Sequence, residues 1–399
     1  MAVAGVIAEY NPFHRGHAWQ MEEIRRRLGA DTAVVACMSG NFVQRGDFAI
    51  VRKHARAEMA LAGGADLILD LPTPWSAAAA ERFAQGGVAL LEATGVVTHL
   101  AFGCECGDLE PLRRVAQCLD SPAYHASLRR HMVEGGPFAA ARQAAVRTLA
   151  GEAAECLSCP NNALAVEYLR ALKAQGCALE PLALPRVGAG HDSAAESDPP
   201  SASAIREKLL AGGGWRELLP EASAAAVEKE IAAGRAPVCL HNCQRAVLSR
   251  LRRMAEGEFR LYDGGNEGLY HRFYAAVRSS VAVEELLSAA KTRRYPMARL
   301  RRILLHSYLG VPEAAPGETP PYIRVLGATE RGRALLRRMR ETASLPVLVK
   351  SAQVRRLGVA ARESFVQEAR CTDLYVLAYP ELREAVPGSE YTSGPVLAL

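Results

Sequence analysis

The sequence lacks long apolar runs, a leader pattern and two common phosphate-binding motifs. No stretch approaches the roughly 20 apolar residues that a membrane-spanning helix needs, and the first basic residue is Arg15, too late for the basic start of a signal peptide. There is no GxxxxGK[ST] segment, and no GxGxxG segment follows an expected strand, which argues against P-loop enzymes and dehydrogenases. We therefore expect a cytoplasmic protein without a membrane partner.

The cysteines do not follow a recognised metal-binding spacing. The chain has ten of them, and in the cytoplasm we expect reduced thiols. Three groups offer donors that zinc accepts: Cys104 with Cys106, Cys156 with Cys159, and Cys239 with His241 and Cys243. None pairs one C-x-x-C with another, so we predict no protein-bound structural metal, and stoichiometric zinc in the purified protein would contradict this.

The length and the apolar pattern predict two domains. A chain of 399 residues exceeds one ordinary core, and short apolar runs alternate with amphipathic ones over the first 110 residues, as in a parallel sheet with crossover helices. Strands are expected at residues 3–9, 32–38, 67–71, 98–102 and 178–185, and helices at 17–28, 51–62 and 77–94. We predict a Rossmann-like α/β domain over residues 1–235, with a helical insertion at about 109–175, and a mainly helical domain over 236–399.

Positive charge is concentrated in the second half. Residues 241–370 contain 24 Lys and Arg against 12 Asp and Glu, and a domain with this balance attracts polyanions, nucleic acid above all. Solvated helix faces are the alternative explanation. Arg alternates with apolar residues in segment 293–302, which favours a structured basic face; its candidate RNA-binding residues are Arg293, Arg294, Arg299, Arg301 and Arg302.

The most informative segment is His14-Arg15-Gly16-His17, which follows the first expected strand and the turn Asn11-Pro12-Phe13. Gly16 permits close approach of a ligand, and the helix that begins here directs unpaired N–H groups and a positive dipole end at an anion. Two imidazoles add donors that can stabilise charge on an attacked phosphate. We predict a nucleoside triphosphate site; the alternative is a capped turn with two surface histidines.

This pattern resembles the HxGH signature of the nucleotidylyltransferase superfamily. Further motifs follow in order and make the chain resemble one of its families, the tRNA(Met) cytidine acetate ligases. The motifs are Glu9-Tyr10-Asn11-Pro12-Phe13-His14-x-Gly16-His17, Met38-Ser39-Gly40-Asn41-Phe42-x-Gln44-Arg45-Gly46, Phe102-Gly103-x-Glu105, Pro160-Asn161-Asn162, Arg186-x-Gly188, Ser203-Ala-Ile-Arg206, Lys291-Thr-Arg-Arg-Tyr-Pro296 and Val325-Leu326-Gly327. Cys104 and Cys106 depart from the pattern, where small or polar residues are more usual.

The resemblance implies ATP-dependent activation of acetate to acetyl-adenylate, then acetyl transfer to N4 of the wobble cytidine (position 34) of elongator tRNA(Met). Domain 1–235 would activate acetate and domain 236–399 would bind tRNA, with Mg²⁺ held through the triphosphate and no obligatory protein partner. His14 and His17 would be catalytic. The implied ATP-contacting residues are Ile7, Ala8, Glu9, Tyr10, Asn11, Pro12, Phe13, His14, Arg15, Gly16, His17, Ala18, Trp19, Gln20, Gly103, Asn162, Arg186, Ser203 and Arg206.

Several of these residues have simpler explanations. Asn162 could be a helix cap, Arg186 a surface ion-pair partner, and Arg45 a solvated loop cation, so Arg45 is left out of the predicted site. Two other functions also remain open. A small-molecule nucleotidylyltransferase would use the histidines but leave the Arg-rich half without a task. A non-catalytic, nucleotide-sensing RNA-binding module would be expected to lack one of the two histidines, and both are present.

Overall fold

The computed structural model describes residues 2–133, 138–186, 201–263 and 268–398. Its centre is a sheet in the order β10-β8-β5-β2-β1-β6-β7, with β9 paired to β8. The strands are β1 Val3–Ala8, β2 Ala33–Ser39, β5 Leu67–Leu71, β6 His99–Cys104, β7 Glu180–Pro185, β8 Ile323–Ala328, β9 Val347–Leu348 and β10 Val396–Leu397. A separate hairpin is formed by β3 Phe42–Val43 and β4 Asp47–Phe48.

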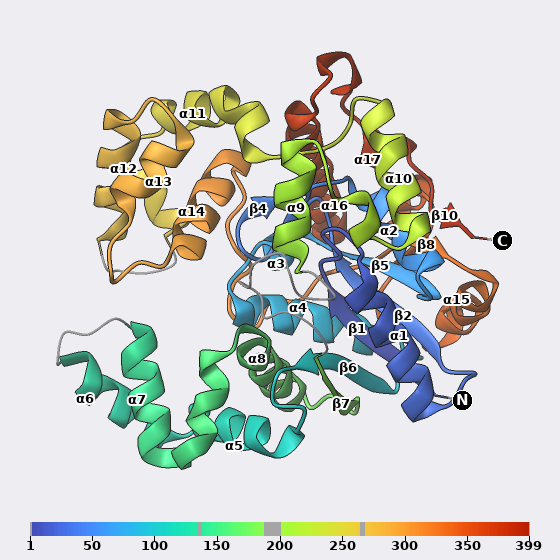
Figure 1. Cartoon of the computed structure of the whole chain (residues 1–399), viewed down its shortest axis with the longest axis horizontal. Helices are drawn as coiled ribbons and strands as arrows, with labels where there is room; N and C mark the ends of the chain where they lie inside the picture. Colours follow the sequence, from blue (N-terminus) through green and yellow to red (C-terminus); the bar gives the residue numbers. More distant parts are fainter. Residues whose placement is uncertain (1, 134–137, 187–200, 264–267, 399) are drawn as a thin grey trace.

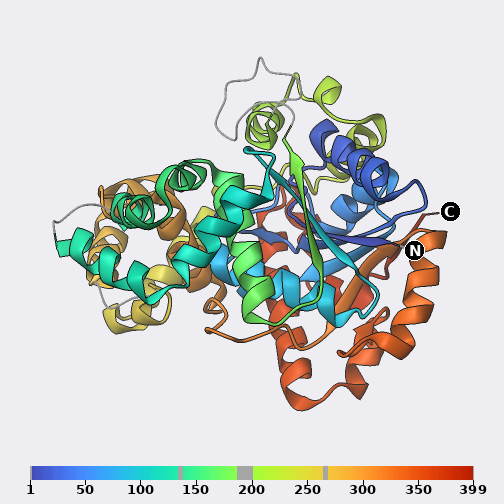
Figure 2. The same ribbon diagram turned by 90° about the horizontal axis from the view of Figure 1, so that it is seen from below.

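Strands β1, β2, β5, β6 and β7 are parallel to one another, as predicted. All residues of β2 and β5 are buried, because helices cover both faces of the sheet (Figure 2). A strand that is buried on both faces has a nearly continuous apolar sequence. For this reason the short apolar runs at 32–38 and 67–71 predicted strands correctly. The predicted Rossmann-like α/β class is confirmed.

Helices connect the strands and form two lobes on one side of the sheet (Figure 1). Helices α5 to α7 belong to one lobe and α11 to α14 to the other. The helices are α1 Arg15–Leu28, α2 Lys53–Ala62, α3 Thr73–Ser76, α4 Ala80–Ala93, α5 Leu109–Leu119, α6 Pro122–Val133, α7 Phe138–Ala150, α8 Pro160–Ala174, α9 Ala202–Ala211, α10 Glu221–Ala232, α11 Gln244–Arg253, α12 Leu269–Ser279, α13 Val283–Ala290, α14 Met297–Leu309, α15 Glu330–Thr342, α16 Val359–Tyr375 and α17 Ser389–Thr392.

The second half of the chain also contributes to the sheet, which the sequence analysis did not predict. Strand β8 pairs antiparallel with β5, and β9 and β10 pair with β8. Main-chain hydrogen bonds therefore join the two sides of the expected boundary near residue 235. The division into two domains remains a prediction, and the central sheet contains strands from both sides of the proposed boundary.

A buried charge cluster fastens the C-terminal helices to the sheet. Lys53 on α2 bonds Asp70 on β5 at 2.6 Å and also pairs with Glu390 on α17, and its Nζ lies 3.9 Å from Glu368 on α16. Glu368 in turn accepts from the backbone N–H and the hydroxyl of Thr73 at 2.8 and 3.0 Å. Buried charges are retained only where such partners are present, so this cluster fixes how α16 and α17 sit on the sheet.

Candidate active site

The loop after β1 is built around His14, which is the N-cap of α1. Its Nδ1 accepts from the Gly16 N–H at 3.1 Å, and the Nδ1 of His17 accepts from the His14 N–H at 3.2 Å. The two side chains thus form a reciprocal capping box, the arrangement that satisfies unpaired donors at a helix start. The helix begins two residues earlier than predicted because His14 itself provides the cap.

These hydrogen bonds also determine where the imidazole protons lie. In each neutral ring an accepting Nδ1 leaves the proton on Nε2. Burial lowers the pKa of His14 to about 3, with the positive charges of Arg186 and Arg206 adding to the effect. Burial also lowers the pKa of His17 well below its usual value. Both histidines are therefore neutral hydrogen-bond donors at pH 7.

Aromatic packing holds the two rings in place. The imidazoles stack with centroids 3.8 Å apart, and the Tyr10 ring lies edge-on to His17 at 4.9 Å and to Phe13 at 5.0 Å. Tyr10 has a positive φ of 45°, a left-handed backbone conformation that is strained for an aromatic residue. Strain of this kind persists where surrounding contacts enforce it, and here the turn brings both histidines to the carboxyl end of β1.

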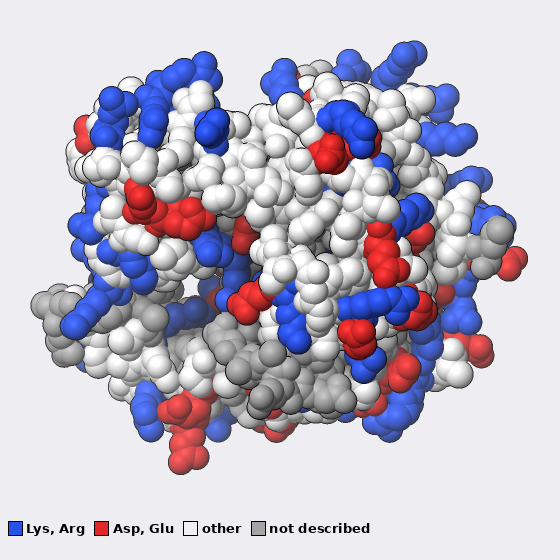
Figure 3. Space-filling model, turned by 45° about the horizontal axis from the view of Figure 1, so that its top comes forward, with Lys and Arg blue, Asp and Glu red and all other residues white. Residues whose placement is uncertain are grey.

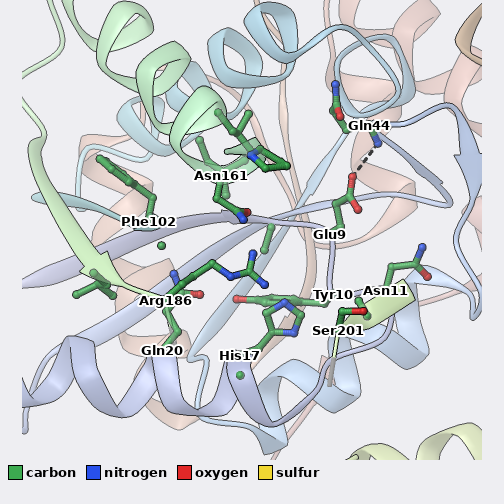
Figure 4. A pocket seen from close by; sticks show the side chains of 18 of the residues that line it. Glu9, Tyr10, Asn11, His17, Gln20, Gln44, Phe102, Asn161, Arg186 and Ser201 are labelled. Atoms are coloured by element: carbon green, nitrogen blue, oxygen red, sulfur yellow. Dashed lines mark hydrogen bonds between the residues drawn. The ribbon is translucent and has the colours of Figure 1, made fainter. Parts of the chain in front are cut away.

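A cavity of about 300 Å³ opens at this carboxyl edge of the sheet (Figure 4). Ligands of open α/β folds bind at such an edge. The cavity is lined by Ile7, Ala8, Glu9, Tyr10, Asn11, His14, Gly16, His17, Trp19, Gln20, Gln44, Arg45, Ala80, Phe83, Phe102, Gly103, Pro160, Asn161, Ala163, Leu164, Tyr168, Leu184, Pro185, Arg186, Ser201 and Ala202.

Cationic side chains reach the cavity from two directions. Figure 4 shows the Arg186 side chain extending from the end of β7 toward His17, and a Cβ at Gly103 would lie 3.4 Å from its Cγ. Arg45 enters from the hairpin β3–β4. Glu9 is the one carboxylate among the described lining residues, and its Oε1 accepts from the Gln44 N–H at 2.9 Å. With the start of α1, this arrangement suits a polyanion.

Asn162 does not line the cavity but holds its wall. Its Oδ1 accepts from the backbone N–H groups of Glu105 and Cys106 at 2.8 and 3.2 Å. The Glu105 carboxylate in return accepts from the backbone N–H groups of Asn161 and Asn162 at 3.2 and 2.8 Å. The turn after β6 and the start of α8 are thereby locked together, and the neighbouring Asn161 faces the cavity instead.

The start of α9 places Ser201, and not the predicted Ser203, among the residues that line the cavity. Ser201 is the N-cap of α9, accepting from the Ala204 N–H at 3.3 Å, and it lines the cavity. The Arg206 guanidinium donates to the Ser203 hydroxyl at 3.0 Å and to the carbonyl of Asn11 at 2.9 Å. Ser203 and Arg206 therefore tie α9 to the β1 loop. Gly188 of the Arg186-x-Gly188 motif lies outside the described residues.

The structure brings most of the predicted nucleotide-contacting residues together. Those on the cavity are Ile7, Ala8, Glu9, Tyr10, Asn11, His14, Gly16, His17, Trp19, Gln20, Gly103 and Arg186. Those not among its lining residues are Pro12, Phe13, Arg15, Ala18, Asn162, Ser203 and Arg206. The apolar residues Phe83, Leu164 and Tyr168 were missed because they come from helices α4 and α8, whose packing against the sheet no local motif reveals. Phe102 and Asn161 adjoin predicted residues and could have been found.

The basic segment 293–302 lies at the junction of the cavity wall and the α11–α14 lobe. Arg293, Arg294 and Arg301 are exposed, and Arg294 and Arg299 lie over the Tyr295 ring at 5.7 and 5.4 Å. Arg301 pairs with Asp47 of the β3–β4 hairpin at 3.5 Å, and Arg302 pairs with Glu313 at 3.0 Å. These contacts fit the expectation of a structured basic face.

This segment also touches the hairpin that borders the cavity. A Cβ at Gly46 would lie 2.6 Å from the carbonyl carbon of Arg301, so only glycine lets the hairpin pack against α14. Figure 3 shows Lys and Arg side chains over the α11–α14 lobe and around the hollow beside it. The β3–β4 hairpin thus links the basic segment to the cavity, because Arg45 lines the cavity and Asp47 pairs with Arg301.

Within the described parts of the chain, no group of three or more His, Cys, Asp or Glu side chains is arranged to hold a metal ion. The absence of a structural metal remains a prediction that metal analysis of the purified protein would test. No helix among those described is long and apolar enough to span a bilayer.

Comparisons with known proteins agree with this geometry. Residues 1–387 match the family model described as HIGH Nucleotidyl Transferase. The tRNA(Met) cytidine acetate ligase of Syntrophomonas wolfei is 36% identical, with 99% of each chain covered, and that of Acetivibrio thermocellus is 34% identical, with 100% of each covered.

Solved structures extend the similarity to three dimensions. Thermotoga maritima TmcAL superposes with a TM-score of 0.93 in its apo form and 0.91 in the form bound with alpha-thio ATP, at 33% identity and over 100% of this chain and 99% of that one. Three observations lead to one conclusion: a histidine caps the helix at the sheet edge, the relatives match over nearly the whole of each chain, and a solved structure superposes on the full chain. This chain belongs to the tRNA(Met) cytidine acetate ligase family of HIGH nucleotidyl transferases.

Proposed function

We propose that this chain is an ATP-dependent ligase that joins acetate to AMP and then transfers the acetyl group to N4 of the wobble cytidine (position 34) of elongator tRNA(Met). The observation that carries the proposal is the pair of neutral, stacked histidines at the start of α1 beside Arg186. This arrangement occurs in a chain whose full-length relatives are named for that activity.

The first step is attack of the acetate carboxylate on the α-phosphorus of ATP, with diphosphate as the leaving group. Acetate needs no general base, because its pKa lies near those of Asp and Glu side chains, roughly 4, and it is ionised at pH 7. Catalysis then rests on position and on charge stabilisation. The Nε2–H groups of His14 and His17 donate to phosphate oxygens, and Arg186 supplies the full positive charge.

The cavity suits Mg²⁺ held through the triphosphate. A single carboxylate, Glu9, occurs among the described lining residues, and one of its oxygens already accepts from the Gln44 N–H. Mg²⁺ keeps several waters and commonly takes only one or two carboxylates beside substrate phosphates, so the residues present fit this mode. When bound, the ion neutralises part of the triphosphate charge; the protein's share is to orient the phosphates.

The second step requires the cytosine amine to reach the acetyl-adenylate. The base must leave its stack, at a cost of a few kcal/mol, and contacts between Arg side chains and tRNA phosphates offset that cost. Arg293, Arg294, Arg299, Arg301 and Arg302 are our candidates for these contacts. The contact of Arg301 and Arg302 with the β3–β4 hairpin supports this, since Gln44 and Arg45 of the hairpin line the cavity. A cytoplasmic location, where tRNA and ATP meet, completes the proposal.

The test is incubation with labelled acetate and ATP, followed by tRNA. Acetyl transfer that needs both ATP and tRNA is the expected result. Diphosphate release with a small-molecule acceptor would indicate a nucleotidylyltransferase instead, and nucleotide and RNA binding without turnover would indicate a sensor. Either outcome overturns the proposal.

A further inference from the structure

Two cysteine pairs that lie 50 residues apart in the sequence meet beside the cavity. Cys104 ends β6 and Cys106 follows in the next turn, while Cys156 belongs to the 3-10 helix Gly151–Ser158 and Cys159 is the N-cap of α8. The lock between Glu105 and the start of α8 holds these two segments against each other, because the side-chain oxygens of Glu105 and Asn162 accept from backbone N–H groups of the opposite segment at 2.8 to 3.2 Å. The proximity therefore does not depend on the thiols themselves.

Cys106 is at the centre of this group. Its thiol is exposed and donates to the carbonyl of Asp108 at 3.3 Å, and beside burial its presence contributes to the raised pKa of the thiols of both Cys104 and Cys156. Cys104 and Cys156 are buried, and the Cys104 thiol also points at the Leu184 carbonyl, 3.7 Å away in β7. All four cysteines are reduced.

We propose that Cys106 and Cys156 form a thiol–disulfide modification site that reacts with low-molecular-weight disulfides. The Cys106 thiolate attacks one sulfur of the reagent and releases one thiol, giving a mixed disulfide. The Cys156 thiolate then attacks the Cys106 sulfur and releases the second thiol. Two protein thiols and one small disulfide yield one protein disulfide and two small thiols, so atoms and electrons balance.

The order of attack follows from exposure. Cys106 is open to solvent and meets the reagent first, whereas burial raises the pKa of the Cys156 thiol to about 11 and restricts it to resolving the adjacent mixed disulfide. Cys104 is the less suitable partner, because a bond between residues two apart closes a ring too small for relaxed disulfide geometry. Among the described residues, no three Cys, His, Asp or Glu side chains are grouped so that they could hold a metal ion.

The bond would fasten the turn after Gly103 to the segment before Pro160 and Asn161. These three residues line the cavity, so the disulfide would fix one of its walls. Formation of the bond itself does not rest on the proposed ligase activity, and its test is independent of that activity.

The experiment treats the full chain with oxidised glutathione and maps peptides without reduction. Cys104 and Cys106 share the tryptic peptide 83–113, and Cys156 and Cys159 share 148–170. We expect these two peptides to be linked, the titratable thiols to fall by two per chain, and the thermal unfolding midpoint to rise, because a cross-link over about 50 residues restricts the unfolded chain.

Single variants identify the sulfurs. Cys106→Ser and Cys156→Ser should abolish the link and the rise in the unfolding midpoint, while Cys104→Ser, Cys159→Ser and the control Cys177→Ser should retain both. Persistence of the link in Cys106→Ser, or unlinked peptides after oxidation, would overturn the proposal. Stoichiometric zinc released from the purified protein by a thiol reagent would overturn it as well, since the thiols would then be metal ligands.

Discussion

Replacing His14 separates its two roles, because one ring nitrogen caps α1 and the other donates into the cavity. In His14→Asn the side-chain oxygen can still accept from the Gly16 N–H, and Asn is among the best N-caps, but the Nε2–H donor is gone. In His14→Ala both are lost. Loss of a donor to charge that develops in a transition state typically costs 10²- to 10³-fold in rate, and loss of a side-chain cap about 1 kcal/mol of stability.

We therefore expect both variants to form acetyl-adenylate about 10²- to 10³-fold more slowly than wild type, while only the alanine variant loses about 1 kcal/mol of unfolding free energy. Adenylation is measured by acetate-dependent exchange of diphosphate into ATP, and stability by urea unfolding. Unchanged binding of tRNA serves as the control. An asparagine variant with wild-type exchange rates would show that His14 only caps the helix and would refute the mechanistic role.

Three other changes test separate parts of the structure. Burial raises the pKa of Glu368 to about 7, so between about pH 4.5 and 7 the folded state keeps a proton that the unfolded state has released. The free energy of unfolding should therefore fall as pH rises through this range, and Glu368→Gln should gain stability relative to wild type between pH 5 and 8. Urea unfolding measures both, and parallel pH curves for the two proteins would contradict the raised pKa. Asn162→Ala should remove the hydrogen bonds to the turn at Glu105 and Cys106 and lower the free energy of unfolding by about 1–3 kcal/mol, because buried N–H groups are left unpaired. It should also raise the KM for ATP more than it lowers kcat. An unchanged KM would refute a positioning role. Charge reversal at Arg293 and Arg294 should weaken tRNA binding and reduce the slope of log K against log salt by about 0.7–0.9 per lost phosphate contact. Filter binding measures both effects, and diphosphate exchange into ATP should stay intact. An equal loss of exchange would contradict a separate tRNA-binding surface.

The sequence predicted those parts of the site that local chemistry determines. The order strand, His14-Arg15-Gly16-His17, helix follows from apolar patterning and capping, both of which act within a few residues. Gly103 and Arg186 were expected from the family resemblance, and they meet because the carboxyl ends of parallel strands lie at one edge of the sheet. These features required no knowledge of packing.

Other features depend on contacts between distant residues. Asn162 looked like a ligand contact or a helix cap, but its oxygen binds a turn 57 residues earlier, and Glu105 performs the capping. Strand β8 joins β5 across more than 250 residues, and no local pattern specifies such a partner. A similar cause places Ser201 rather than Ser203 on the cavity, because Arg206 ties α9 to the carbonyl of Asn11.

The most direct test of the central claim is a crystal structure of this chain with an ATP analogue that resists hydrolysis. We predict that the triphosphate lies at the start of α1, with its oxygens within hydrogen-bonding distance of Nε2 of His14 or His17 and of the Arg186 guanidinium. An analogue bound elsewhere, for example in the groove between α1 and α15 lined by Arg25, Arg331 and Arg337, with the histidines left without a phosphate contact, would contradict the account.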